Sequence, residues 1–339
     1  MALTDASTTD FQAVYVTISQ VAVHRDGGDW DIVSSLNKTV NLFDLVNGVR
    51  QDLGLATLTS GSYTQLRLIL SPTPDGSINI LSQGHPFGNY FIDNSGVSQE
   101  LKVPSGFQSG IKVVKGFDIN ANQTTELVLD FNAAKSIVKA GASGKWLLKP
   151  TIKVLNVVEY SIIEGNVGQA GVLVTAQIYT TSATQQEDRV QVQTATVTDA
   201  GGGYKLFVEP GSYTLVGYKD GFFPFFRNQK IDTTAGSVVT ADFSLIAALT
   251  GTLTDGPVTI SGGDQEQYAT ISVRQAATVG GNPEQIEVKS VNVANGGAIT
   301  TGLPVGNYTA VVSTFGKSTI VQSFTISQGM IRDMGAVSF

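Results

Sequence analysis

Apolar and polar residues alternate along most of this chain in short runs, and clusters of turn residues separate the runs. Examples are "FQAVYVTISQVAVH", "YTQLRLIL", "TELVLDF" and "YKLFVEP". Alternation with a period of two is the pattern of a half-buried strand, and Gly-rich or Asp-rich clusters are typical of the turns between strands. The pattern therefore predicts an all-β fold built from β-sandwiches. Helical periodicity is scarce, and only residues 42–54 and 132–141 favour one short helix each, both in the first part of the chain.

One short motif, Gly-[Ser/Asn]-Tyr-Thr, occurs three times, at Gly61, Gly211 and Gly306. Each time an alternating or apolar run follows, so Gly with Ser or Asn makes a turn and Tyr-Thr begins a strand that enters a core. We expect Tyr63, Tyr213 and Tyr308 to be buried rings whose hydroxyls cap a neighbouring loop, as in a tyrosine corner. A role for these rings in stacking on a ligand is the alternative.

The second half of the chain shows an internal repeat. "SIIEGNV" at 161–167 resembles "AALTGTL" at 247–253, and each copy ends in a closing strand, "ADFSL" or "GAVSF". Self-similarity of this kind indicates two copies of one domain. We therefore predict three consecutive β-sandwich domains over residues 1–157, 158–246 and 247–339. No Pro-rich or Ser-rich linker separates them, which favours a stiff rod over a flexible string of domains.

Composition narrows the classes of function. The net charge of −7 disfavours a nucleic-acid partner, since such proteins carry a basic stripe. The chain has no cysteine and only two histidines, which excludes thiol nucleophiles and leaves few ways to build a zinc site or a catalytic triad. No apolar run is long enough to span a membrane. We therefore expect a protein that is not an enzyme and has no cofactor.

Three groups of residues are candidates for binding. The stretch "KDGFFPFFRNQK" places Phe222 and Phe226 on one side of an extended chain and Phe223 and Phe225 on the other, so about half of these rings should lie outside a core. A neighbouring domain, a partner protein, a second copy of the chain or a glycan would cover them. The indoles Trp30 and Trp146 are candidate platforms for a sugar, with burial in the core as the alternative. The acids Asp26, Asp29 and Asp31 cluster at a hairpin tip and could hold calcium, although acids at such a place normally face water.

Two resemblances to known families add to this reading. Residues 3–157 resemble domain of unknown function 4382 through "AVYVTISQVAVHRDGGDW" (13–30), "LKVPSGFQSGIKVVKGF" (101–117) and "LVLDFNAAKSIVKAG" (127–141). This resemblance implies a β-rich exported domain of bacterial and archaeal surface lipoproteins, usually preceded by a lipid-modified cysteine. It carries over no functional residues.

Residues 158–246 resemble the carboxypeptidase regulatory-like domains, which are small transthyretin-like or immunoglobulin-like sandwiches and not peptidases. The matching stretches are "EGNV" (164–167), "ATVTDAGGGYKLFVEPGSYTLVGYKDGF" (195–222) and "ADFSL" (241–245). The last domain resembles the family through "TTGLPVGNYTAVVS" (300–313).

Together these observations predict a prokaryotic protein outside the cell or on the outer face of the envelope, which serves as a stalk, scaffold or binding module. The expected partner is a protein or glycan at the cell surface, and the membrane is reached only through a lipid anchor that this chain lacks. One alternative is a carbohydrate-binding surface protein. Another is a self-assembling filament or sheath subunit, in which an edge strand or the segment "ALTDAS" pairs into the next molecule. A homo-oligomer is left open.

Overall fold

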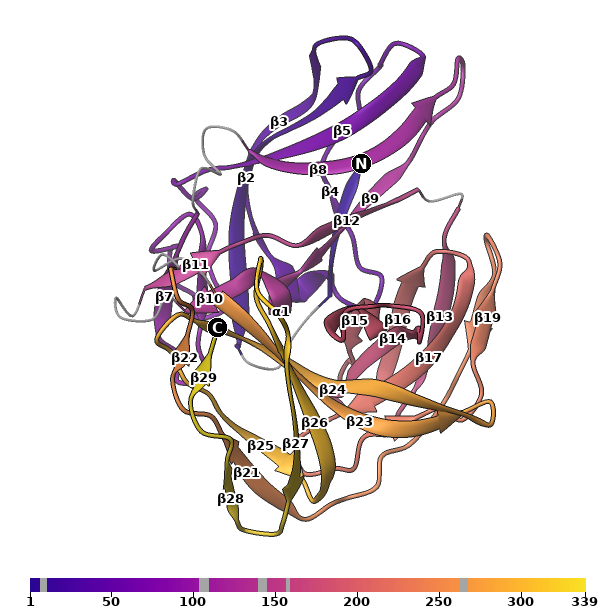
Figure 1. The fold of residues 1–339 in the computed structure, drawn as a ribbon. Coiled ribbons are helices and arrows are strands. Elements are labelled where there is room, and N and C mark those ends of the chain that lie inside the picture. Colours follow the sequence, from indigo (N-terminus) through magenta and orange to yellow (C-terminus); the bar gives the residue numbers. More distant parts are fainter. Residues whose placement is uncertain (7–10, 104–109, 140–144, 157–158, 263–267) are drawn as a thin grey trace. The chain divides into compact units, whose positions relative to one another are not determined.

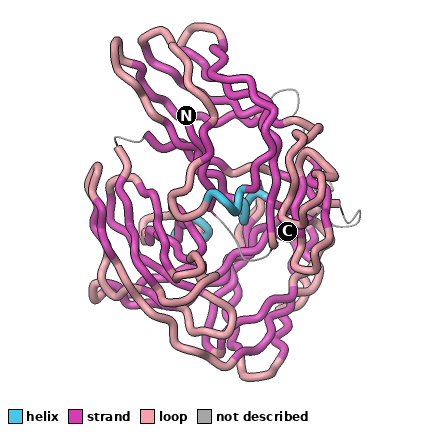
Figure 2. The backbone as a smooth tube through the Cα atoms, turned by 180° about the vertical axis from the view of Figure 1, so that it is seen from behind, coloured by secondary structure: helices cyan, strands magenta, loops and turns pink. Residues whose placement is uncertain are grey.

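The computed structural model describes residues 1–6, 11–103, 110–139, 145–156, 159–262 and 268–339. Strands and loops make up nearly all of the described chain, and the helices are short (Figures 1 and 2). The predicted all-β fold is therefore confirmed. The chain divides into two compact units, one formed by Met1–Ile137 with Trp146–Tyr160 and the other by Val138–Lys145 with Ser161–Phe339. The predicted boundary at 157/158 lies outside the described residues.

Both predicted helices are much shorter than the sequence pattern suggested. The first is a single 3-10 turn, η1 (Leu42–Leu45), capped by the Asn41 side chain. It ends because Val46 is extended, with φ −83° and ψ 168°, and Asn47 and Gly48 then follow at positive φ angles of 56° and 83°. The second is one turn, α1 (Ala133–Ser136), capped by Asn132. Residues 140–141 of that predicted helix lie outside the described part of the chain.

The first unit packs two sheets around a main core, and a smaller cluster of Ala13, Tyr15, Tyr90 and Ile92 is separate from it. The smaller sheet has the order β12-β9-β1-β4, and the larger runs β11-β7-β6-β2-β5-β8 with β3 also paired to β2. The core between them contains apolar side chains of alternate strand positions, such as Val14, Val16 and Ile18 of β2. The strands of this unit are β1 (Ala2–Ala6), β2 (Ala13–Arg25), β3 (Trp30–Asn41), β4 (Gln51–Asp52), β5 (Gly61–Leu70), β6 (Tyr90–Ile92), β7 (Ser98–Lys102), β8 (Ile111–Ile119), β9 (Leu127–Asn132), β11 (Trp146–Leu148) and β12 (Ile152–Asn156). The short β10 (Ile137–Lys139) follows α1.

The N-terminal strand β1 lies inside its own sheet. It pairs with β9 in parallel on one side and with β4 in antiparallel on the other. Strand β9 pairs along all of β1 on one edge, but β4 pairs only with Ala2 and Leu3 on the other. The prediction that the segment "ALTDAS" pairs into the next molecule therefore stays a prediction. Pairing through one of the remaining edge strands stays a prediction.

The second unit contains two hydrophobic cores, and the strands around them repeat one pairing scheme. Around the first core, β13 pairs with β16 in antiparallel and with β20 in parallel. Around the second, β21 pairs in the same way with β25 and β28. The facing sheets are β15-β14-β17-β18 and β24-β23-β26-β27. We call the parts around these cores the first sandwich (161–246) and the second sandwich (247–339).

The elements of the first sandwich are β13 (Ser161–Asn166), β14 (Leu173–Tyr179), η2 (Glu187–Arg189), β15 (Val190–Val197), β16 (Gly203–Val208), β17 (Gly211–Tyr218), β18 (Phe225–Phe226), β19 (Ile231–Thr233) and β20 (Val238–Thr240). Those of the second sandwich are β21 (Thr250–Thr254), β22 (Val258–Thr259), β23 (Tyr268–Val279), β24 (Asn282–Ala294), β25 (Thr300–Pro304), β26 (Gly306–Ser313), β27 (Ile320–Ile326), β28 (Ile331–Asp333) and β29 (Val337–Ser338).

The glycines that the two copies share are required for close packing. A Cβ atom at Gly165 would lie 2.7 Å from the carbonyl oxygen of Ala241, and one at Gly251 would lie 2.4 Å from that of Ser327. No side chain fits at such distances, so both positions need glycine. The sequence repeat therefore marks equivalent places in the two sandwiches.

The three Gly-x-Tyr-Thr motifs each begin a strand, β5, β17 or β26, and each tyrosine ring is buried, at 1–3% exposed. Every hydroxyl donates a hydrogen bond to the carbonyl oxygen four residues earlier. The pairs are Tyr63 to Thr59 at 3.0 Å, Tyr213 to Glu209 at 2.5 Å and Tyr308 to Pro304 at 3.0 Å. The prediction of tyrosine corners is confirmed at all three positions.

Candidate functional site

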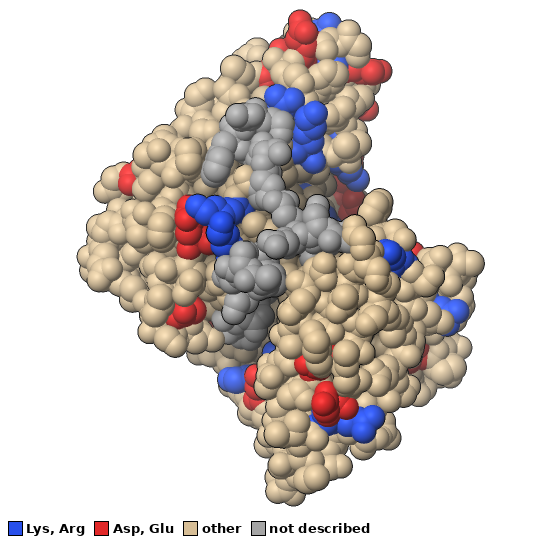
Figure 3. Space-filling view, turned by 60° about the vertical axis from the view of Figure 1, so that its left-hand side comes forward, with Lys and Arg blue, Asp and Glu red and all other residues tan. Residues whose placement is uncertain are grey.

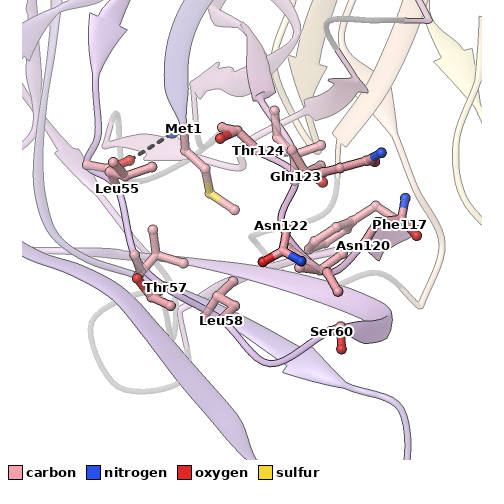
Figure 4. A pocket seen from close by; sticks show the side chains of 17 residues that line it. Met1, Leu55, Thr57, Leu58, Ser60, Phe117, Asn120, Asn122, Gln123 and Thr124 are labelled. Atoms are coloured by element: carbon pink, nitrogen blue, oxygen red, sulfur yellow. Dashed lines mark hydrogen bonds between the residues drawn. The ribbon is translucent and has the colours of Figure 1, made fainter.

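A pocket of about 500 Å³ opens in the first unit between two loops (Figure 4). One loop, residues 53–60, leads from β4 into β5. The other, residues 120–126, connects β8 to β9. In Figure 4, Thr57 and Leu58 lie on one side, Phe117 and Asn122 lie on the other, and the Met1 side chain reaches in between. The pocket has the size of a small-molecule site.

The lining is mixed in polarity but carries no ionisable side chain. Apolar groups come from Leu58, Phe117 and Ile119, and polar ones are the amides and hydroxyls of the two loops. The Met1 amino nitrogen donates a hydrogen bond of 2.8 Å to the Gly54 carbonyl, drawn as a dashed line in Figure 4. The lining residues are Met1, Val33, Gly54, Leu55, Ala56, Thr57, Leu58, Ser60, Phe117, Ile119, Asn120, Ala121, Asn122, Gln123, Thr124, Thr125 and Leu127.

Local contacts hold both loops in place. The Phe117 ring stacks on Tyr63, with ring centroids 5.4 Å apart and planes 11° apart, so the first tyrosine corner also supports the pocket wall. The Thr125 hydroxyl donates to the Asp118 carbonyl at 3.1 Å, which ties the ends of the second loop together. Asn122 turns that loop with a φ of 61°, a conformation that asparagine tolerates better than most residues.

Part of the segment from Phe117 to Leu127, including Asn120 and Gln123, also lines a second pocket of about 580 Å³. That neighbour differs in charge because Lys115, Asp118 and Glu159 contribute to its wall. The two pockets thus offer an uncharged and a charged surface on either side of one loop.

Neither candidate sugar platform lines the uncharged pocket. Trp30 is partly buried and lies under the Arg67 guanidinium, which is 3.9 Å from the ring centroid. Trp146 packs edge-on against Phe91 at 4.8 Å and Phe11 at 6.2 Å, beside the core of the first unit. Both indoles therefore have aromatic or cationic neighbours from the chain itself.

The three candidate calcium ligands lie at the hairpin between β2 and β3, as expected. Asp26 and Asp29 are exposed, while Asp31 is partly buried and accepts a 3.2 Å hydrogen bond from the Tyr63 hydroxyl. Within the described ranges, no group of three or more His, Cys, Asp or Glu residues could hold a metal ion. The structure thus provides Asp31 with a structural role beside the first tyrosine corner.

The four phenylalanines of the aromatic stretch separate into different environments. Phe222 and Phe225 pack against the core of the first sandwich, where Phe225 stacks on Phe243 with centroids 4.3 Å apart. Phe226 packs against the core of the second sandwich. Phe223 is 40% exposed. The neighbouring sandwich thus covers one of these rings, and Phe223 is the one left facing solvent.

The two sandwiches of the second unit meet through a buried arginine. Arg274 of β23 is only 1% exposed. Its guanidinium donates to the carbonyl oxygens of Gln186 and Glu187 at 2.7 and 2.9 Å, and its Nε donates to the Ser272 hydroxyl at 2.9 Å. The Ser272 hydroxyl in turn donates to the Glu287 carboxylate at 2.6 Å. Burial lowers the pKa of Arg274, and the negative charges of Glu287 and Glu187 oppose that shift.

Two further contacts extend this interface. The Gln177 side-chain amide pairs with the Glu287 backbone in both directions, donating at 2.7 Å and accepting at 2.9 Å. The buried Glu284 accepts a hydrogen bond from Thr214 at 3.2 Å and forms an ion pair with Lys230 at 2.9 Å. Val216 and Tyr218 of β17 join the core of the second sandwich. Strand β17 therefore has its own core on one face and the neighbouring sandwich on the other.

A second charged residue, Asp255, is also buried, but it differs from Arg274 in its hydrogen-bond partners. It is 5% exposed, and neither carboxylate oxygen has a hydrogen-bond partner that meets ordinary geometry among the described residues. Burial, and then the nearby charge of Asp333, raise the pKa of Asp255 to about 6.

Sequence reasoning missed the pocket, Arg274 and Asp255. The pocket loop "NANQTT" (120–125) differs from the other turns in its run of amides and hydroxyls, and that run is the signal that could have directed attention to it. Arg274 and Asp255 carry no such signal because each is one charge in an ordinary strand or turn.

Charged residues of both signs are scattered among uncharged ones on the face in Figure 3. Among the described residues, no helix is long and apolar enough to cross a membrane.

These features define an all-β protein of several small sheets with a ligand-sized, uncharged pocket in its first unit. Residues 1–150 match the family model described as domain of unknown function DUF4382, which confirms that resemblance for this part of the chain. The resemblance of residues 158–246 to carboxypeptidase regulatory-like domains is not confirmed and stays a prediction. No curated protein matches the chain.

Several solved structures are similar at low sequence identity. The Bacillus anthracis TIE protein shares 14% identity at a TM-score of 0.21, over 99% of this chain and 49% of its own. The Streptococcal ancillary pilin shares 10% at 0.21, over 98% and 97%. The shaft pilin SpaA from Lactobacillus rhamnosus GG shares 10% at 0.18, over 53% and 98%. This chain thus spans about half the length of the first of these structures.

Proposed function

We propose that this chain is a non-enzymatic surface protein of a prokaryotic cell, and that its β-sandwiches form a scaffold for a binding surface. The all-β fold and the match of residues 1–150 to domain of unknown function DUF4382 support this proposal. A lipid anchor outside this chain would attach it to the outer face of the envelope. Its partner would be a protein or glycan at the cell surface.

The observation that carries the proposal is the buried polar interface of the second unit. A scaffold has to keep its parts in a fixed relation, and flexible linkers do not do this. Arg274 connects the two sandwiches through hydrogen bonds of defined direction, and Gln177 and Glu284 add further ones. Directional contacts that leave few buried groups unpaired hold one arrangement over others. The second unit would therefore behave as one rigid body.

Paired spin labels test this rigidity. The chain has no cysteine, so Ala235→Cys and Ser318→Cys, both at exposed positions in different sandwiches, would carry the only labels. Double electron–electron resonance should give one narrow distance distribution, and adding Arg274→Ala should broaden it. A broad distribution without Arg274→Ala would overturn the rigid scaffold.

Surface exposure is tested with the same chemistry in the cells that make the protein. The single variant Ala235→Cys should react with a membrane-impermeant maleimide on intact cells, to the same extent as after lysis. Labelling that appears only after lysis would place the protein inside the cell and remove the surface assignment.

A further inference from the structure

The uncharged pocket of the first unit has a chemistry that the scaffold function does not use. Its wall combines apolar groups with the amides and hydroxyls of the two loops (Figure 4). We propose that this pocket binds a short neutral oligosaccharide. The proposal goes beyond the scaffold and does not depend on it.

The polar part of the lining fits a ligand rich in hydroxyl groups. Asn120, Asn122 and Gln123 each present a carbonyl acceptor and an NH₂ donor, and Thr57 adds a hydroxyl. All four residues are exposed, and their side-chain polar atoms make no hydrogen bond to another described residue. They are free to exchange water for a ligand. A sugar hydroxyl both donates and accepts, so amides and hydroxyls satisfy it in either direction.

The apolar part fits the carbon-bound faces of a sugar ring. Phe117 and Leu58 contribute apolar surface and pack in part against the core of the first unit. Phe117 is further held by its stack on Tyr63. A wall fixed in this way loses little conformational entropy when a ligand binds.

The charge of the pocket lining distinguishes between classes of ligand. No lining side chain is that of Asp, Glu, Lys, Arg or His, and the Met1 ammonium is paired with the Gly54 carbonyl at 2.8 Å. Phosphate and carboxylate ligands call for Arg, Lys or a helix N-terminus, and cationic ligands call for acids or an aromatic cage. The volume of about 500 Å³ is within the range of small-ligand sites. A neutral polyhydroxylated ligand is therefore the class that satisfies the amides without leaving a charge unpaired.

The test uses the full chain and isothermal titration calorimetry. The probes are short oligosaccharides of glucose, mannose, xylose and N-acetylglucosamine, with oligouronates as the anionic set. At least one neutral oligosaccharide should bind, and the oligouronates should not. Absence of binding across the neutral set, or binding of oligouronates alone, would overturn the proposal.

A variant pair places the binding at this pocket. Asn122→Gly keeps the positive φ while removing the amide, and together with Gln123→Ala it should weaken binding by about tenfold or more, since each lost hydrogen bond is worth about 1 kcal/mol. The matched control is Asn47→Gly, because Asn47 has a similar φ of 56° in the same unit and does not line the pocket. It should bind as the unchanged protein does. Unchanged binding in the double variant, with loss in Trp30→Ala, would move the site to the indole and refute the pocket.

Discussion

Arg274 and Asp255 are both buried charges of the second sandwich, at 1% and 5% exposed, yet their surroundings are opposite. Arg274 reaches two backbone carbonyls of the first sandwich and one hydroxyl of its own. The Asp255 oxygens have no partner of ordinary hydrogen-bond geometry among the described residues, and they lie near a second carboxylate, that of Asp333. Removing a charge from water costs several kcal/mol, and hydrogen bonds of good geometry offset that cost only where they are made.

Burial alone therefore does not show whether a charged residue specifies an interface or makes stability depend on pH. At Arg274 the hydrogen bonds connect two sandwiches, so the cost of burial is offset and an interface is specified. At Asp255 the cost is reduced by proton uptake, because the protonated carboxyl has no charge to desolvate. The first charge should stabilise the arrangement at all pH values, and the second should make stability depend on pH.

Replacing Arg274 by Met should produce the largest effect. The change leaves two carbonyl oxygens and the charges of Glu187 and Glu287 without their buried cation, so the free energy of unfolding of the second unit should fall by about 3–5 kcal/mol. Hydrogen exchange followed by mass spectrometry reports this unit separately. Arg274→Lys is the control and should lose less, since it keeps the charge. A loss below about 1 kcal/mol would show that the arginine does not hold the interface.

Asp255→Asn should change the pH dependence of stability. The pKa of Asp255 is about 6 in the folded chain, against an ordinary value of 3.8, so the folded state binds the proton more tightly than the unfolded state. The contribution of Asp255 to the free energy of unfolding is therefore fully present below pH 4. It falls by about 2–3 kcal/mol between pH 4 and pH 6. Asp255→Asn should abolish this decline. Urea unfolding at pH 4, 5 and 7 measures it, and an unaltered decline in the variant would assign the titration to another group.

Lys230→Met should have an intermediate effect. Its partner Glu284 is buried but keeps the hydrogen bond from Thr214, and Lys230 itself is about one-third exposed. We expect a loss of about 1 kcal/mol in the free energy of unfolding. Lys230→Arg should restore most of it. If Lys230→Met lowers the free energy of unfolding as much as Arg274→Met does, the partial exposure of Lys230 does not moderate the loss.

Lys205→Met should have the smallest effect. The Lys205–Glu164 pair has a short distance of 3.0 Å, but both side chains are more than one-third exposed. Water and salt screen such pairs, so the free energy of unfolding should change by less than about 0.5 kcal/mol. A larger loss, measured by thermal unfolding, would mean that the distance between the two charges, and not their burial, determines how much an ion pair stabilises the fold.

Some of these features could be predicted from the sequence and others could not. Tyr63, Tyr213 and Tyr308 were predictable because a tyrosine corner is a local motif, with the acceptor four residues away. The aromatic stretch shows where such reasoning ends. The alternation of side chains along a strand predicted that Phe223 and Phe226 lie on opposite sides. The packing of Phe225, however, depends on Phe243, eighteen residues away in the chain.

The sequence by itself determined the strands, their turns, the tyrosine corners and the internal repeat, because each depends on neighbouring residues and a period of two. The tertiary structure alone decided which loops enclose the pocket and why Arg274 is buried with partners. It also decided why Asp255 is buried with no partner of ordinary hydrogen-bond geometry among the described residues. Those outcomes depend on contacts between residues far apart in the chain, such as Arg274 with Gln186. A charge in an alternating strand looks the same in the sequence whether water or a second sandwich covers it.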